Sequence, residues 1–191
     1  MSPTPRLIAC TLALTLCTGY ALAQTALAPD TLKVDYFSNA HSSDPDGTVR
    51  ITNAGTSGGN LCAAIFVYDA LQELTECCSC AVTPNGLQTL SVDKNLLDNP
   101  LNGISPTTGS IRIVSTTPVG GVCPLPVTGK ITPTAGLRAW ATHIQSSSRI
   151  TETASQDATL SSAELGLLEA DCRAVALVGS KQGICTCGTG D

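Results

Sequence analysis

The stretch Thr75-Glu-Cys-Cys-Ser-Cys80 places three cysteines within four residues, shortly before the turn sequence Pro84-Asn-Gly86. Three thiols this close together can form a metal site, a redox centre or a set of disulfide bonds. Which of these applies depends on the compartment in which the protein works and on the partners that the chain offers. The remainder of the sequence therefore decides what this cluster does.

The N-terminus has the pattern of a secretory signal peptide. Arg6 is followed by an apolar run that ends with Ala21 and Ala23 in Ala-x-Ala spacing. This pattern predicts a signal peptide over residues 1–23 and a single secreted domain over residues 24–191. A membrane anchor is less favoured, because the apolar run has about 17 residues and is interrupted by glycine and threonine. We therefore expect a secreted protein (periplasmic, cell-surface or extracellular), with no membrane span once the signal peptide is removed.

Removal of the signal peptide would take away two of the ten cysteines and leave an even number in an oxidising compartment. That combination favours disulfide bonds. Eight thiols allow 105 connectivities, and the sequence does not select one of them. The eight candidate disulfide cysteines are Cys62, Cys77, Cys78, Cys80, Cys123, Cys172, Cys185 and Cys187.

The spacing of these cysteines limits their partners slightly. If residues 75–80 are extended, Cys78 and Cys80 lie on one face of a strand and Cys77 lies on the other. The cluster can then reach partners in two directions. The C-terminal Cys185-Thr-Cys187 is suited to receive bonds from the cluster or from Cys172. Each such bond would stabilise the fold by about 2 to 4 kcal/mol.

A metal site and a redox centre fit the pattern less well. Zinc clusters usually contain two Cys-x2-Cys pairs, and this chain has one, from Cys77 to Cys80. Copper(I) would need thiols that stay reduced, which secretion disfavours. A thioredoxin-type centre needs its Cys-x-x-Cys at the start of a helix, but a turn and another β-rich run follow here. We therefore expect no cofactor.

Short β-rich runs bounded by turn sequences recur along the chain and predict an antiparallel β-sandwich, immunoglobulin-like or jelly-roll-like. The predicted strands cover residues 31–38, 48–52, 61–68, 87–92, 110–115 and 137–144. A helix is predicted near residues 162–175, because Ser161-Ser-Ala-Glu164 has the form of a capping box and Gly179 can end the helix. The predicted fold is thus mainly β, with one C-terminal helix and stabilising disulfides.

Two parts of the chain resemble each other. Gly47-Thr-Val-Arg-Ile51 and the later Val82-Thr-Pro-Asn-Gly-Leu87 have counterparts in Gly109-Ser-Ile-Arg-Ile113 and Ile131-Thr-Pro-Thr-Ala-Gly-Leu137. A cysteine follows each Arg-Ile strand at a similar distance. The pattern indicates either a degenerate duplication or two strands built from the same few residue types.

Charge and composition exclude some partners. Without Arg6 the chain has nine Lys and Arg residues against fifteen Asp and Glu residues, a net charge of −6. No run of basic residues occurs, so nucleic acid and anionic membranes are not expected partners. Aromatic residues make up only 3% of the chain, which limits the apolar area that its core can bury.

Two short motifs suggest other chemistry. Gly55-Thr-Ser-Gly-Gly59 matches the nucleophile elbow of serine hydrolases, with His143 as a base, but it lies between two strand-like runs and is interpreted as a hairpin loop. Asp44 and Asp46 stand before a glycine, as in a calcium loop, but the glutamate expected at the twelfth position is absent. We interpret this segment as a β-turn, with the two aspartates as the only calcium candidates.

Several segments resemble a family of uncharacterised secreted bacterial proteins that carry a Cys-Cys-x-Cys block and a C-terminal Cys-x-Cys-Gly block. The segments are residues 61–69, 72–87, 136–145, 160–165 and 183–188. The resemblance covers most of the predicted mature chain. It implies secretion and a single folding unit, and it implies no activity, ligand or catalytic residue.

The sequence as a whole favours an exported, non-enzymatic structural, surface or interaction protein. Its expected partner is another extracellular protein or a cell-surface component. The alternative is an extracellular module that binds a sugar or a metal ion, and a hydrolase is less favoured than either. Trp140 and Tyr68 are the candidate sugar-binding residues, because sugar sites usually offer an aromatic face, although core packing could also explain both.

Overall fold

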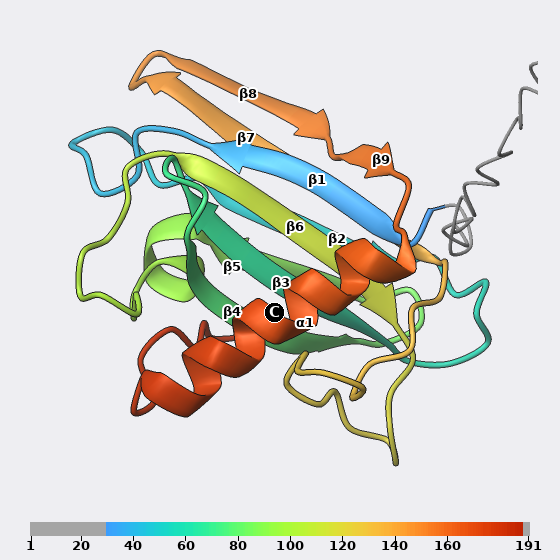
Figure 1. Cartoon of the computed structure of the whole chain (residues 1–191). Helices are drawn as coiled ribbons and strands as arrows, with labels where there is room; N and C mark the ends of the chain where they lie inside the picture. Colours follow the sequence, from blue (N-terminus) through green and yellow to red (C-terminus); the bar gives the residue numbers. More distant parts are fainter. Residues whose placement is uncertain (1–29, 189–191) are drawn as a thin grey trace, which may run out of the picture.

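The structure of the protein is a computed structural model that describes residues 30–188. Within these residues the chain forms nine strands, one π-helical turn and one α-helix (Figure 1). These elements are β1 (Leu32–Phe37), β2 (Thr48–Asn53), β3 (Leu61–Asp69), β4 (Leu74–Val82), β5 (Leu87–Ser91), η1 (Val92–Leu96), β6 (Gly109–Thr116), β7 (Leu137–Ser146), β8 (Arg149–Ala154), β9 (Gln156–Ala158) and α1 (Ser162–Val178). The predicted signal peptide over residues 1–23 lies outside the described residues.

The strands form two antiparallel sheets that pack face to face. The five-stranded sheet has the order β4-β3-β6-β1-β9, and the four-stranded sheet has the order β5-β2-β7-β8. Val49 and Ile51 of β2 and Ile111 and Ile113 of β6 are buried in the core between the sheets. This alternation follows from the two-residue period of a strand. The predicted mainly β sandwich with one C-terminal helix is confirmed.

The six predicted strands agree with the structure to within two residues at each end. β4 contains the cysteine cluster and pairs with β3 along its whole length. β4, β8 and β9 were not among the six predicted strands, although residues 75–80 were considered as an extended segment. Every residue of β8 is exposed, so the strand lacks the alternation of apolar and polar residues that reveals a half-buried strand.

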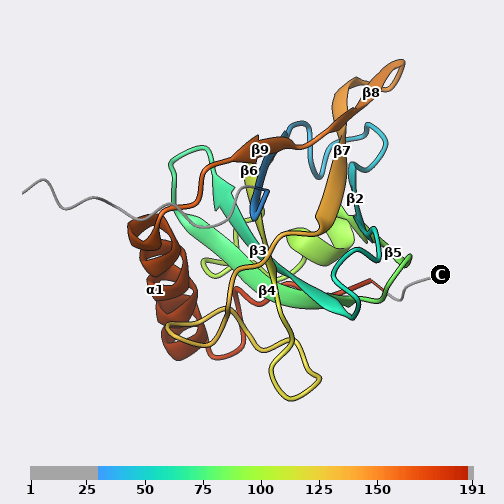
Figure 2. The same ribbon diagram turned by 90° about the vertical axis from the view of Figure 1, so that its right-hand side faces the viewer.

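Helix α1 covers the outer face of the five-stranded sheet. Its buried residues Leu168, Cys172 and Val175 recur at helical spacing and pack against Phe66 and Val114 of the sheet. Figure 2 shows the helix on one side of the molecule only. The two sheets therefore differ, because no helix of the described residues lies over the outer face of the four-stranded sheet.

The ends of α1 are where the sequence predicts them. The hydroxyl of Ser161 accepts a hydrogen bond from the N–H of Glu164 at 3.0 Å, a cap worth about 1 kcal/mol. The Glu164 carboxylate does not complete the capping box, because it pairs with Arg112 of β6 instead. Gly179 ends the helix, where a Cβ atom would lie 2.3 Å from the carbonyl oxygen of Gln182. Only glycine fits at this close approach.

All eight candidate cysteines form disulfide bonds. The pairs are Cys62–Cys123, Cys77–Cys172, Cys78–Cys185 and Cys80–Cys187. Cys77 faces outward to α1, whereas Cys78 and Cys80 face the core between the sheets, as the alternation along an extended strand predicts. The cysteine cluster thus holds the helix on one face of β4 and the C-terminal segment on the other.

The C-terminal segment, residues 183–188, closes one side of the sandwich. The N–H of Cys77 in β4 donates to the carbonyl oxygen of Gly183 at 2.8 Å. Five residues further on, the side chain of Gln88 in β5 donates to the carbonyl oxygen of Gly188, also at 2.8 Å. The segment therefore runs from the edge of one sheet to the edge of the other. It also covers the edge of β4, which would otherwise be open to pairing with another strand.

A continuous stretch of chain closes the opposite side. β8 pairs with β7 in the four-stranded sheet, and after Ser155 the chain continues as β9, which pairs with β1 in the five-stranded sheet. Strands that switch sheets in this way make the corners of closed sandwiches. The core is therefore enclosed on both sides.

The two similar parts of the sequence make matching contacts in the two sheets. The N–H of Asn85 donates to the carbonyl oxygen of Asn53 at the end of β2, and the N–H of Thr134 donates to the carbonyl oxygen of Ser115 near the end of β6, both at 2.8 Å. Asn85 and Thr134 each follow the proline of their copy. The resemblance between the two parts thus extends to their three-dimensional contacts.

Candidate functional site

The outer face of the four-stranded sheet carries Trp140 near its centre. Leu137, Ala139 and Ala141 of β7 point into the core, so Trp140 between them points outward and is half-buried. Its cross-strand neighbours are Arg50 on β2 and Ala154 on β8. Because the side chain of Ala154 is only a methyl group, it covers little of the Trp140 indole on the side toward β8.

Two ion pairs flank Trp140 on this face. Arg50 pairs with Glu152, and because Glu152 lies opposite Thr142, this pair spans β7 beside the indole. Both side chains are about 40% exposed. On the other side of Trp140, two residues back along β7, Arg138 pairs with Asp30.

Asp30 is held in its charged form. Burial alone would raise the pKa of its carboxyl group, but hydrogen bonds from Lys33 and Arg138 and the charges of these two residues hold that pKa below its usual value. Lys33 is buried behind Asp30 and also pairs with Asp157. The positive and negative charges around this end of the sheet are therefore balanced.

A polar hollow of about 400 Å³ lies beside Arg138 at the end of the sandwich. Asp30 and Arg138 line it, together with hydroxyl and amide groups from the β2–β3 loop and from two segments before β7. The other polar lining residues are Thr56, Ser57, Asn60, Thr117 and Thr134. The hollow thus offers many hydrogen-bonding groups and no aromatic ring.

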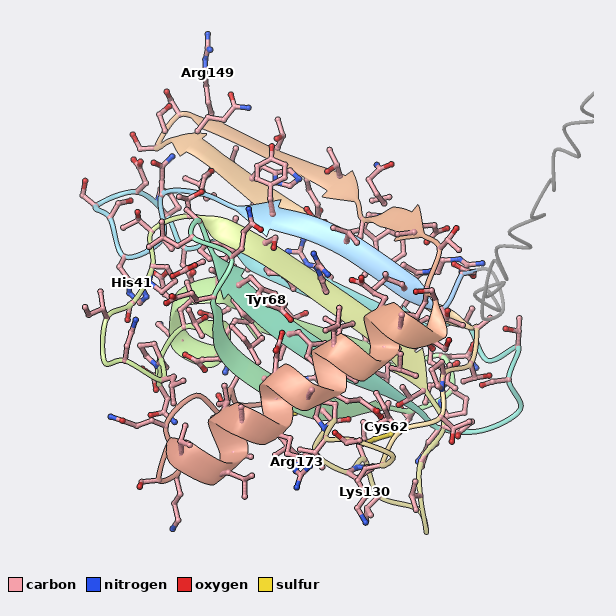
Figure 3. The ribbon with its side chains drawn as sticks, in the orientation of Figure 1. His41, Cys62, Tyr68, Lys130, Arg149 and Arg173 are labelled. Carbon is pink, nitrogen blue, oxygen red and sulfur yellow. A yellow bond between two sulfur atoms is a disulfide. The ribbon has the colours of Figure 1, made fainter. Side chains whose placement is uncertain are left out.

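Tyr68, the second sugar-binding candidate, lies on the covered face. It stands on β3 beside α1, in a hollow of about 230 Å³ between the helix and the sheet (Figure 3). Its hydroxyl donates to Asp171 at 2.9 Å, and the Arg112 guanidinium lies 5.2 Å from the centre of its ring. Burial and the neighbouring Asp171 raise the pKa of the tyrosine further above its usual value. Tyr68 is therefore engaged in holding the helix to the sheet.

The structure gives Asp46 a structural role and does not bring it into an acidic cluster with Asp44. One carboxylate oxygen of Asp46 accepts a hydrogen bond from the N–H of Asp93 at 3.0 Å, and the other accepts one from the Ser91 hydroxyl. Asp46 thus fixes the loop before β2 against η1. Across residues 30–188, no three His, Cys, Asp or Glu side chains are grouped so that they could hold a metal ion.

Ser57 and His143 are far apart. Ser57 lies close to Gly136, just before β7 begins, and His143 lies seven residues further along the chain. Seven extended residues span roughly 23 Å. The Ser57 hydroxyl donates to the carbonyl oxygen of Gly59, within its own loop. The hairpin-loop interpretation of this motif agrees with the structure, and a hydrolase centred on Ser57 does not.

His143 instead belongs to a buried polar group beneath β8. Its Nε2 atom lies 2.7 Å from the Thr153 hydroxyl and 3.4 Å from a carboxylate oxygen of Asp35, while the Ser155 hydroxyl donates to the other oxygen of Asp35 at 2.8 Å. The Nδ1 atom is buried and has no hydrogen-bond partner. A catalytic triad needs the nucleophile on one ring nitrogen and the carboxylate on the other. Here both lie at the same nitrogen, so this geometry is not a proton relay.

No protein-family model, curated protein or solved structure matches this chain. The resemblance to secreted bacterial proteins therefore stays a prediction. In the described part of the chain, no helix is long and apolar enough to cross a membrane.

Sequence reasoning found Trp140 but missed the four charged residues around it. Arg50 and Glu152 are 102 residues apart in the chain, and Asp30 and Arg138 are 108 apart. They come together only through the pairing of β2, β7 and β8 and through the position of β1 beside β7. The one local signal was the alternation along β7, which places Arg138 and Trp140 on the same face.

Proposed function

We propose that this chain is an exported, non-enzymatic interaction protein, and that it binds its partner through the outer face of the four-stranded sheet. The expected partner is a cell-surface component or another extracellular molecule. The observation that carries the proposal is the difference between the two outer faces. One is covered by α1, which is bonded to it through Cys77–Cys172, whereas the other has no helix over it within residues 30–188 and presents Trp140 between two ion pairs.

Two further features support the proposal. Four disulfides among the described residues suit a protein that works in an oxidising compartment outside the cytoplasm. The two histidines also suit a non-enzymatic role, because His41 lies on an exposed loop, and the buried His143 has its hydroxyl and carboxylate neighbours at the same nitrogen.

A surface-binding assay with two matched variants tests this proposal. Thr89→Arg adds a bulky charge to the exposed outer face of β5, next to Arg50 on the same sheet. Ala176→Arg adds the same side chain to the exposed side of α1. We expect the labelled wild-type protein to bind the surface of the cells that produce it, and Thr89→Arg to weaken this binding by about tenfold or more, because a misplaced charge at an interface costs several kcal/mol. Ala176→Arg should bind as the wild type does.

The proposal fails if the wild-type protein does not bind, or if both variants bind as well as the wild type. It also fails if Ala176→Arg alone loses binding, because the contact surface would then be the helix. Both variants change exposed side chains only, so their thermal unfolding should match that of the wild type.

A further inference from the structure

We propose that the ligand of this face is a neutral oligosaccharide, with one sugar ring stacked on Trp140 and its hydroxyl groups bonded to the flanking ion pairs Arg50–Glu152 and Arg138–Asp30. This inference rests on the proposed function, because it names the chemistry of a ligand for the same surface.

The position of the indole suits stacking against a sugar ring. Trp140 is half-buried on the outer face of the sheet, and its neighbour on β8 is the small residue Ala154. An aromatic ring has a negative face, and the C–H groups on one side of a pyranose ring carry a weak positive charge, so the two surfaces attract each other when stacked. A tryptophan that serves only the core of this protein would point inward, as Leu137 and Ala139 do on the same strand.

The two ion pairs have the hydrogen-bonding chemistry that sugar hydroxyls require. A sugar hydroxyl both donates and accepts hydrogen bonds. Neighbouring hydroxyls on a ring therefore match a guanidinium, which only donates, placed beside a carboxylate, which only accepts. Arg50 and Glu152 form such a pair beside Trp140, and both side chains keep about 40% of their surface exposed. They remain accessible to a ligand while they hold each other in place.

The charges around Trp140 and Arg138 are balanced. Arg50 and Arg138 are matched by Glu152 and Asp30. Lys33, which also pairs with Asp30, is balanced by Asp157. A polymer with phosphate, sulfate or carboxylate groups needs an excess of positive charge, which this group of residues around Trp140 and Arg138 does not have. The charge balance therefore favours a neutral ligand over an anionic one.

The polar hollow beside Arg138 extends the site. Its volume of about 400 Å³ falls in the usual range for small-molecule sites, about 300 to 1,000 Å³. Trp140 is two residues from Arg138, which is roughly 7 Å along an extended strand. A chain of sugars with one ring on Trp140 can thus place its next unit over Arg138 and direct hydroxyl groups toward Thr56, Ser57 and Asn60.

Trp140 provides a direct readout, because it is the only tryptophan in the chain. The experiment is a fluorescence titration of the oxidised protein with soluble neutral polysaccharides (xylan, mannan, β-glucan, starch and a chitin oligomer), with dextran sulfate and polygalacturonate as anionic probes. We expect at least one neutral probe to shift the emission to shorter wavelength and to bind saturably, because stacking removes water from the indole.

Four variants assign the contacts, with binding measured by calorimetry where the tryptophan is absent. Trp140→Ala should weaken binding about tenfold or more, whereas Trp140→Phe should keep most of it. Arg50→Gln should weaken binding, and Arg173→Gln is its matched control. Arg173 lies on the exposed side of α1, away from the four-stranded sheet (Figure 3). The control should bind as the wild type does.

The inference is wrong if no neutral probe changes the fluorescence, if Trp140→Ala binds sugar as well as the wild type, or if only the anionic probes bind. These failures are distinguishable from a failure of the proposed function. If Thr89→Arg still abolishes binding to the cell surface while no sugar binds, the face is an interaction surface and its ligand is not a neutral sugar.

Discussion

Replacing Cys78, Cys80, Cys185 and Cys187 by alanine lowers the free energy of unfolding by about 5 kcal/mol, because two covalent loops are lost, one of about 15 residues (about 3 kcal/mol) and one of about six residues (about 2 kcal/mol). The loss would be about 7 kcal/mol if the first loop had about 100 residues. Cys78 and Cys185 are 107 residues apart in sequence. However, Cys77 is bonded to Cys172, so the shortest covalent path between them has only about 15 residues. With Cys77–Cys172 in place, Cys78–Cys185 therefore closes a short loop, and Cys80–Cys187, the second disulfide to the C-terminal segment, closes a still smaller ring beside it.

The same reasoning predicts how the bonds depend on one another. Removing Cys77–Cys172 alone should cost about 3 kcal/mol, because the two disulfides to the C-terminal segment keep the chain closed around it. Removing all three bonds should cost about 10 kcal/mol, more than the sum of the two separate losses. Denaturant unfolding of the non-reduced variants, followed by circular dichroism, measures each value.

Replacement of Cys62 and Cys123 provides the control for these measurements. This bond lies outside the shared path, so its loss should add to the others without coupling. If the variant without Cys78–Cys185 and Cys80–Cys187 loses about 7 kcal/mol while Cys77–Cys172 is intact, the shared-path explanation is wrong.

The second large effect concerns Glu76 and pH. Glu76 lies in β4 directly before the cysteine cluster and is fully buried. One carboxyl oxygen accepts a hydrogen bond from the N–H of Asn99 at 2.9 Å, and the other oxygen has no partner. Burial, together with the nearby negative charge of Asp98, raises the pKa of Glu76 to about 8, although the Asn99 hydrogen bond lowers it.

A raised pKa means that the folded protein prefers the protonated carboxyl group. The contribution of Glu76 to stability is therefore complete below the unfolded pKa of 4.5 and is lost as the pH rises through about 8. The shift corresponds to a loss of about 5 kcal/mol between these limits. We expect the free energy of unfolding, measured by denaturant titration at several pH values, to fall across this range and to level off above it.

Glu76→Gln tests the assignment, because glutamine keeps the shape and the acceptor for Asn99 but has no charge. This variant should lose most of the pH dependence and should be more stable than the wild type at pH 9. Glu73→Gln is the matched control, on the turn before β4, where the side chain is exposed. A wild-type stability that rises between pH 5 and 8, or a Glu76→Gln variant with an unchanged slope, would contradict this explanation.

The sequence predicted the use of the cysteine cluster well, because alternation along a strand is a local property. It placed Cys77 on one face and Cys78 and Cys80 on the other, and the structure bonds the first to α1 and the other two to the C-terminal segment. The identity of the partners was not predictable. Each bond joins residues 61 to 107 positions apart, and these distances are set by how the two sheets pack.

Polar residues on β1 show a second reason why burial could not be predicted from the sequence. In Leu32-Lys-Val-Asp-Tyr-Phe37 the pattern does not reveal that Lys33 and Asp35 are both buried. They are buried because β8 and β9 cross from one sheet to the other beside β1, and they find partners there in Asp157 and Ser155. β8 itself has no buried residue. The local sequence pattern therefore predicts neither this strand nor the buried polar residues that lie beneath it.

The same limit applies to the candidate binding face. Trp140 was recognisable in the sequence as a rare aromatic residue, but whether it can bind a ligand depends on the residues that surround it in the fold. Arg50 and Glu152 reach it from strands that are distant in the sequence. The position of α1 away from this sheet also follows from the tertiary fold, because the disulfide from Cys77 fixes the helix on the opposite sheet.

The central claim is that this cysteine cluster joins β4 to both α1 and the C-terminal segment, and peptide mapping without reduction tests it most directly. Trypsin should release residues 51–94, 113–130, 150–173 and 182–191 as one disulfide-linked species, because the four bonds connect them all. Further cleavage after Glu76 should separate a Cys62–Cys123 pair from a second species that holds the other six cysteines, with no free thiol in either. Free thiols at these positions, or a bond between Cys62 and the C-terminal segment, would contradict the claim.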